Sequence, residues 1–99
     1  MKSMNEKLAD QCESVSGLIK AIAHPLRLKI LCRLVDGECT VSAIEEYCGA
    51  SQSSVSQYLG KMKLEGLLSA RRDGKKIYYQ IDHPDLIKLM RSMQRIFCD

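Results

Sequence analysis

Hydrophobic residues recur at helical spacing in the first third of the chain and predict two helices there. In residues 6–23 successive hydrophobic residues along one helix face are alternately four and three positions apart. This spacing forms a narrow stripe of the kind that packs against another helix. The stripe comprises Leu8, Cys12, Val15, Ile19 and Ile22. In residues 25–35 hydrophobic positions cover more than one face, so the second helix is expected to be mostly buried. Pro25 disfavours helix at His24 and suits the first position of a new helix, so we interpret His24 as a boundary residue.

Two shorter helices are predicted next, with a three-residue turn between them. The first starts at Thr40 or Ser42, since Ser42 and Glu45 have the spacing of a capping box, and it ends near the following glycine. The second starts after Ser51, a good N-cap, and stops at Gly66, a residue that tolerates positive φ. Its outer face is polar, and its hydrophobic stripe would face the core through Val55, Leu59 and Met62. This arrangement is typical of a helix-turn-helix, at about residues 40–66.

A β-hairpin and a last helix complete the predicted fold. Asp73-Gly74 lies between the extended runs 67–72 and 75–81, which is a strong short-range signal for a two-residue hairpin turn. Pro84 then opens a helix that reaches about Phe97, with Asp82 or His83 as its cap. We therefore predict a single domain over residues 1–99 that is mainly α with a small β-hairpin, a winged helix-turn-helix whose wing spans about residues 67–81.

The two terminal helices, at about residues 6–23 and 84–98, lie outside this winged unit. The stripe of the last helix comprises Leu86, Leu89, Met90, Met93 and Phe97. Together the two stripes offer more apolar surface than one small core can cover, which indicates pairing with a second copy in a twofold dimer. A twofold protein would also match the half-sites of a palindromic DNA sequence. The alternative is that both helices cover the back of the monomer.

Charge is distributed unevenly, although the net charge is only +3. Residues 51–80 hold six Lys and Arg against two Asp and Glu, whereas the remaining residues hold nine against ten. The whole surplus lies on the polar helix and the hairpin, as expected for a DNA-binding protein. Amides and hydroxyls of the helix would reach base edges in the major groove, from Gln52, Ser53, Ser54, Ser56 and Gln57. Cations would hold phosphates and set the register, from Lys61, Lys63, Arg71, Arg72, Lys75 and Lys76.

Several classes of function find no support in the sequence. The N-terminal residues lack the apolar run of a secretory signal, and no apolar run exceeds three residues, so we expect a cytosolic protein without a membrane partner. Five cysteines, an odd number without a Cys-x-x-Cys pair, argue against a disulfide framework and a zinc ribbon. Both histidines, His24 and His83, lie beside a proline, and no other pattern suggests catalysis, so neither an enzyme nor a cofactor is expected.

Four segments carry the pattern of a known family: residues 23–31 (AHPLRLKIL), 51–59 (SQSSVSQYL), 65–68 (EGLL) and 72–79 (RDGKKIYY). With the order of the elements, they resemble the ArsR/SmtB family of winged-helix repressors, and the resemblance covers nearly the whole chain. One departure is Tyr58, where the family usually has His, a change that could alter base or phosphate contacts. The resemblance implies a homodimeric transcriptional repressor that leaves a palindromic operator when an inducer binds.

The residues that correspond to the family's common metal sites differ from the ligands those sites need. The family's arsenic and lead sensors carry Cys-Val-Cys at the start of the third helix, where this chain has Thr40-Val41-Ser42. Its zinc and nickel sensors use an Asp-x-His pair with further His or Glu on the last helix. Here residues 82–85 read Asp-His-Pro-Asp, and residues 86–99 contain no His or Glu. No metal site is therefore expected.

The thiols are the remaining candidates for sensing. The contexts of Cys32 and Cys98 resemble the dithiol branch of the family, which includes sulfide-responsive repressors and the haemolysin regulators of vibrios. That resemblance implies that a low-molecular-weight persulfide or an oxidant links the two cysteines within one subunit, so that DNA affinity falls. From the residues alone, Cys32 lies on a hydrophobic face of the helix at residues 25–35, and its position favours a small side chain of the core. Cys12 could approach Cys98 in a dimer, while Cys39 and Cys48 are interpreted as incidental, with Cys39 a candidate surface thiol.

Two other functions stay open at the level of sequence. The fold would be the same if the inducer were arsenite or antimonite, held by thiolates among Cys12, Cys32 and Cys98. A protein-interaction module with passive thiols belongs to a different class, and salt-dependent binding to a palindromic duplex would exclude it.

Overall fold

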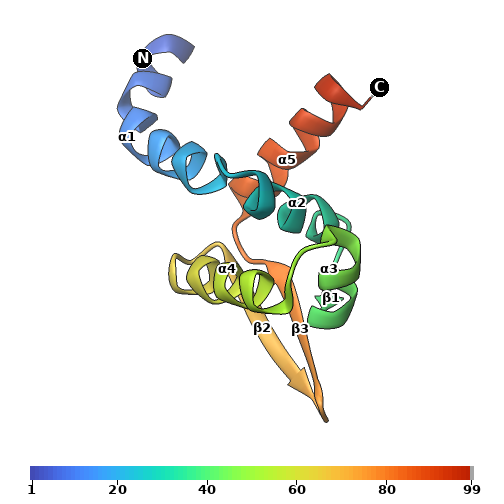
Figure 1. Cartoon of the computed structure of the whole chain (residues 1–99). Coiled ribbons are helices and arrows are strands. Elements are labelled where there is room, and N and C mark those ends of the chain that lie inside the picture. The colour runs from blue at the N-terminus through green and yellow to red at the C-terminus, as the bar shows by residue number, and fades with distance from the viewer. Residues whose placement is uncertain (99) are drawn as a thin grey trace.

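The computed structural model describes residues 1–98 as helices around a small sheet (Figure 1). Its elements follow in the order α1 (Met4–Ile22), α2 (Pro25–Leu34), β1 (Cys39–Thr40), α3 (Val41–Cys48), α4 (Gln52–Leu64), β2 (Leu68–Asp73), β3 (Lys76–Ile81) and α5 (Pro84–Phe97). The predicted fold is confirmed: α3 and α4 form the helix-turn-helix, and β2 and β3 form the wing.

The rotation of α4 about its axis is set by the hydrophobic stripe predicted for it. Val55, Leu59 and Met62 are at most 1% exposed and pack among the buried residues of α2, α3 and α5. Burial contributes about 1.5–3 kcal/mol for each such side chain. Because turning α4 would expose all three, its polar face stays outward.

Each helix within residues 1–98 begins with a side chain that accepts a hydrogen bond from a backbone N–H of the first turn. These caps, at 3.1–3.2 Å, are Ser3, His24, Thr40, Ser51 and His83. The roles predicted for Ser51 and for His24 as a boundary residue are confirmed. The capping box predicted at Ser42 is wrong, because Thr40 already caps α3 and Ser42 lies inside the helix.

The sheet differs from the prediction in two details. The last ladder pair of the hairpin joins Asp73 to Lys76, so the two-residue turn is Gly74-Lys75 and not Asp73-Gly74. Gly74 takes the position that needs positive φ, at 63°. The sequence analysis also missed β1, which pairs antiparallel with β3 and gives the strand order β1-β3-β2. A strand of two residues has no alternating pattern by which it could be recognised.

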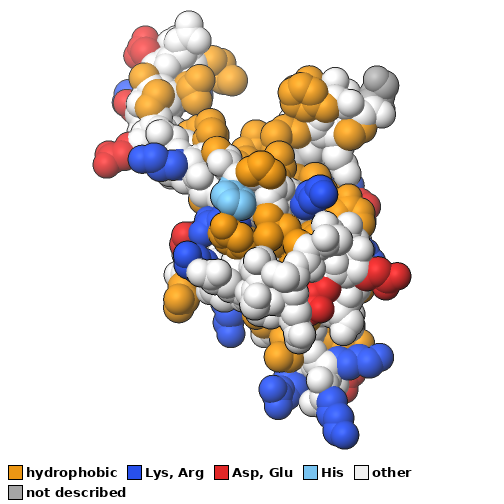
Figure 2. Space-filling view, in the orientation of Figure 1, with side chains coloured by type: hydrophobic (Ala, Val, Ile, Leu, Met, Phe, Trp, Pro, Cys, Tyr) orange, Lys and Arg blue, Asp and Glu red, His pale blue; other side chains and the backbone are white. Residues whose placement is uncertain are grey.

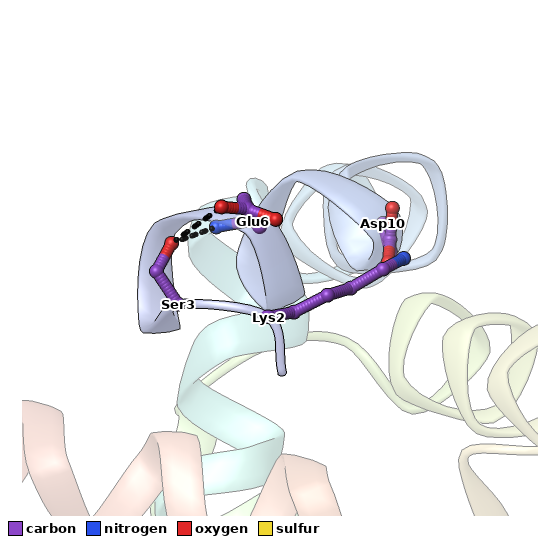
Figure 3. A network of polar contacts seen from close by, with 4 residues as sticks. All are labelled: Lys2, Ser3, Glu6 and Asp10. Atoms are coloured by element: carbon purple, nitrogen blue, oxygen red, sulfur yellow. Dashed lines mark hydrogen bonds and ion pairs between the residues drawn. The ribbon is translucent and has the colours of Figure 1, made fainter.

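The terminal helices project from the body as two diverging arms (Figure 1). Ser3 caps the start of α1, and Lys2 forms an ion pair with Asp10 there (Figure 3). Hydrophobic side chains lie along both arms and across the body between them (Figure 2). In the single chain Leu8, Ile19 and Phe97 are 58%, 50% and 79% exposed, so the predicted stripes are largely uncovered. No helix in residues 1–98 combines the length and apolar character needed to cross a bilayer.

Candidate nucleic-acid interface and cysteine pair

The outer face of α4 carries the predicted base-reading residues, but they are not equivalent. Gln52, Ser53, Ser56 and Gln57 are exposed along this face. Ser54 is half-buried, and its hydroxyl accepts a 2.9 Å hydrogen bond from the Ser51 hydroxyl. Ser54 is thereby part of the helix cap and offers less to a ligand than its neighbours. Two predicted phosphate contacts are exposed in the last turns of the helix, Lys61 and Lys63.

A groove joins the recognition face to the wing. Its volume is about 580 Å³, and its lining brings Gln52 and Ser56 of α4 together with Lys75 and Lys76 of the wing. Glu45 of α3 adds one carboxylate to the same groove. Lys and Arg side chains gather at the wing tip (Figure 2). The arrangement is suited to a polyanion that runs from the face of α4 to the tip of the wing.

The four wing cations fall into two groups. Arg72, Lys75 and Lys76 are exposed, and none of them forms an ion pair within residues 1–98. Arg71 instead donates to both carboxylate oxygens of Glu38, at 3.0 and 2.5 Å, and its guanidinium lies 4.3 Å from the centre of the Tyr78 ring. The hydrogen bonds from Arg71 lower the pKa of the Glu38 carboxyl, so this acid is ionised at neutral pH.

Tyr58 points from α4 toward the start of α2. Its hydroxyl lies 3.0 Å from Nε2 of His24. Because Nδ1 of His24 accepts the Leu26 N–H, the proton of the neutral ring is on Nε2, which donates to the Tyr58 hydroxyl. Arg27 of α2 makes a bidentate contact with Glu65, at 2.8 and 3.2 Å, just past the end of α4. These contacts fix α4 against α2.

The five cysteines, all free thiols, separate into exposed and buried sets. Cys12, Cys32 and Cys98 are exposed, whereas Cys39 and Cys48 are 4% and 5% exposed. The prediction that Cys39 is a surface thiol is wrong, because pairing of β1 with β3 carries its side chain into the core. The sequence also placed Cys32 on the buried face of α2. That face is formed by other residues of the helix, namely Ile30, Leu31 and Leu34.

Cys32 lies within electrostatic reach of two other thiols. Partial burial, and then the charge of a Cys98 thiolate, raise the pKa of the Cys32 thiol. Burial likewise raises the pKa of the Cys48 thiol. The positive charge of Lys29 lowers this pKa in part, and the charge of Cys32 raises it further. Within residues 1–98 the structure brings together no group of three or more His, Cys, Asp or Glu side chains that could hold a metal ion.

Comparison with known proteins decides the family. The model of the arsR family of bacterial regulatory proteins matches residues 24–70. The biofilm growth-associated repressor of Xylella fastidiosa is 33% identical over 93 residues, which covers 94% of this chain and 82% of the relative. The chain belongs to the ArsR family. As a member of the ArsR family, it is a DNA-binding transcriptional regulator.

Solved structures of similar proteins agree with this assignment. The crystal structure of the transcriptional repressor BigR from Xylella fastidiosa has a TM-score of 0.90 and 32% identity, covering 98% of this chain and 99% of the other. Reduced HlyU from Vibrio cholerae has a TM-score of 0.86 and 26% identity, covering 95% and 99%. A third structure is the homodimeric winged helix-turn-helix DNA-binding domain of a possible ArsR-family regulator from Mycobacterium bovis. Its TM-score is 0.70 and its sequence identity 34%, and the match covers 97% of this chain and 86% of the other.

The sequence analysis missed the ion pairs that join separate elements. Arg71 and Glu38 are 33 residues apart, and Arg27 and Glu65 are 38 residues apart. A third pair, Arg91 and Asp36, links α5 to the loop after α2; these two residues are 55 positions apart. Charged residues recur too often for such distant pairs to be recognised from spacing.

Proposed function

We propose that this chain is a homodimeric transcriptional repressor that is released from a palindromic operator when Cys32 and Cys98 of one subunit become linked through sulfur. The observation that carries the proposal is the exposure of these two thiols, one on α2 and one directly after α5. After partial burial, the charge of a Cys98 thiolate also raises the pKa of the Cys32 thiol. The similarity to a transcriptional repressor and to a regulator solved in a reduced form supports it.

DNA would be bound by the face of α4 and by the wing. In this proposal Gln52, Ser53, Ser56 and Gln57 contact base edges in the major groove, and Arg72, Lys75 and Lys76 contact phosphates beside it. The shared groove between the two elements supports simultaneous contact. The protein would act in the cytoplasm, where bacterial DNA lies.

The dimer would form through the two arms. The uncovered hydrophobic residues of α1 and α5, such as Leu8, Ile19 and Phe97, would be buried against the same residues of a second copy. The homodimeric domain from Mycobacterium bovis supports this arrangement. A twofold dimer presents two α4 helices to successive half-sites, about 34–36 Å apart along B-DNA, and its affinity depends on that spacing.

The chemistry needs a persulfide, R–S–SH, and two thiols. Cys98 is exposed at the end of α5, whereas the raised pKa of Cys32 makes Cys32 the weaker first nucleophile. The Cys98 thiolate attacks the outer sulfur of R–S–SH, R–SH leaves, and Cys98 carries a persulfide. The Cys32 thiolate then attacks the inner sulfur of that persulfide and expels hydrosulfide. One R–S–SH and two thiols thus give a disulfide, R–SH and H₂S, so the persulfide is reduced and the thiols are oxidised.

Linkage would move α5. The C-terminal end of α5 stands clear of the body (Figure 1), and Cys32 and Cys98 are free thiols. A disulfide requires its sulfurs to be about 2 Å apart. We infer that closing the bond would draw the last turn of α5 toward α2, and since α5 belongs to the dimer arm, the spacing of the two α4 helices would change. A coupling of about 1–3 kcal/mol between such sites is typical.

The test uses cysteine variants and an operator selected from random duplexes with the reduced protein. Glutathione persulfide should release DNA from the wild type and from Cys48→Ser, and should leave Cys32→Ser and Cys98→Ser bound. Hydrogen peroxide and, under anaerobic reduced conditions, arsenite serve as the competing inducers. Normal release of the Cys98→Ser protein by persulfide would overturn the proposal, and release by arsenite alone would favour a metalloid sensor.

A further inference from the structure

The loop between α2 and β1, residues 35–38, is held by α5 on one side. Arg91 of α5 donates through Nη1 to Oδ1 of Asp36 at 2.9 Å and through Nη2 to the carbonyl oxygen of Val35 at 3.2 Å. Arg91 lies two helical turns before Cys98 on the same helix. Any rotation or bending of α5 that moves Arg91 therefore acts directly on this loop.

The same loop holds the wing on its other side. Glu38 accepts two hydrogen bonds from Arg71 of β2, and Arg71 stacks on Tyr78 of β3. The next residue, Cys39, pairs with Tyr79 in the sheet. Only Gly37 separates Asp36, which Arg91 of α5 contacts, from Glu38, which contacts the wing. The φ angle of Gly37 is 143°, a conformation that other residues rarely adopt. In Figure 1 α5 lies above α2 and the hairpin lies below it.

We propose that residues 35–38 couple α5 to the wing, and that Arg91, Asp36, Glu38 and Arg71 are positioning residues that set the wing relative to α4. This inference rests on the proposed function, since the signal is the movement of α5 when Cys98 is linked. Each subunit then has its own route to DNA release, because the wing shifts against α4 of the same chain. A change in the spacing of the two α4 helices would add to this effect.

The salt dependence of DNA binding distinguishes a positioning arginine from an arginine that binds phosphate. Substitution of a side chain that binds one phosphate in each subunit removes two contacts from the dimer, and so reduces the magnitude of the slope of log K against log salt by about 1.8. Arg72→Ala, in the adjacent exposed cation, should show this change. Arg71→Ala should lower affinity with the slope unchanged, and Glu38→Ala should weaken binding as well. If Arg71 bound phosphate directly, Arg71→Ala would lower the slope, and Glu38→Ala would strengthen binding by freeing the guanidinium.

The coupling itself is tested in the full dimer with glutathione persulfide. Arg91→Gln removes the hydrogen bonds to the loop. Arg95→Gln is the matched control, because among residues 1–98 Arg95 donates to Ser92 of its own helix and to no other element. The measured quantity is the ratio of operator Kd in the linked and reduced forms, with linkage verified by mass spectrometry. Since exposed ion pairs contribute little each, we expect Arg91→Gln and Asp36→Asn to reduce this ratio about two- to fivefold. Arg95→Gln should keep the wild-type ratio.

The outcomes separate the two claims. If Arg91→Gln becomes linked and releases DNA with the wild-type ratio, the coupling through residues 35–38 is refuted and the thiol switch stands. If the wild-type protein becomes linked without losing affinity, the proposed function itself falls. The operator Kd of reduced Arg91→Gln is measured beside that of the wild type, so that any change in basal affinity cancels in the ratio of linked to reduced Kd.

Discussion

Arg27 should contribute more to the stability of the fold than its ion-pair partner Glu65, because Arg27 makes a second hydrogen bond. The Arg27 side chain is only 12% exposed, whereas that of Glu65 is 43% exposed. Arg27 also donates to the carbonyl oxygen of Ala21 at 3.0 Å, and Arg27→Met would leave that carbonyl without this donor. Removing a hydrogen bond of this kind costs about 1–3 kcal/mol. The ion pair itself, screened on the Glu65 side, should contribute about 0.2–1 kcal/mol.

Urea denaturation of the two single variants and the double variant, at one fixed protein concentration, measures these values. Arg27→Met should lower the free energy of unfolding by about 1.5–3 kcal/mol and Glu65→Gln by less than about 1 kcal/mol. The double-mutant cycle should give a coupling of about 0.2–1 kcal/mol. Lys63→Met, at an exposed position on α4, is the control and should stay within about 0.5 kcal/mol. Equal decreases for Arg27→Met and Glu65→Gln would refute the reasoning, because the hydrogen bond to Ala21 would then contribute nothing.

Three further predictions follow from the site. Gln52→Ala should cost about 1–3 kcal/mol of binding per half-site and relax specificity at one base position in each half-site, with the salt slope unchanged, as measured by fluorescence anisotropy on single-substitution operators. A lowered slope would instead make Gln52 a phosphate-binding residue. Ser51→Ala should lower the free energy of unfolding by about 0.5–2 kcal/mol through loss of the α4 cap, and an unchanged urea midpoint would contradict this. Partial burial, and then the charge of a Cys98 thiolate, raise the pKa of the Cys32 thiol. Cys98→Ser removes the second cause, so it should lower that pKa and speed iodoacetamide alkylation of Cys32 near pH 8, whereas slower alkylation would contradict the assigned repulsion.

The helices and their caps were predictable from the sequence, because burial of one helix face and the capping of a helix end each require particular residue types at fixed spacing. The stripe of Val55, Leu59 and Met62 had to face a core, and the structure buries all three. The cap at Ser51 and the positive φ of Gly66 were likewise local requirements, each met by the residue type that suits it.

Features that depend on one contact between distant residues could not be predicted in this way. The burial of Cys39 follows from two ladder pairs with β3, which no pattern around Cys39 indicates. Arg71 has the same local sequence signal as Arg72, yet Glu38 lies beside only the first of them. The exposure of Cys32 depends on which face of α2 packs inward. The sequence placed Cys32 on the inward face, which was wrong, because α2 has hydrophobic residues on more than one face and their spacing does not say which of them is buried.

The most direct test of the account follows linkage and DNA binding in the same samples. Reduced wild-type dimer is titrated with glutathione persulfide, and each aliquot is divided between mass spectrometry of the Cys32–Cys98 link and anisotropy on the selected operator. The account predicts that affinity falls in proportion to the fraction of subunits linked internally, and that a reductant restores both. Complete linkage with affinity unchanged, or loss of affinity before any link forms, would contradict it.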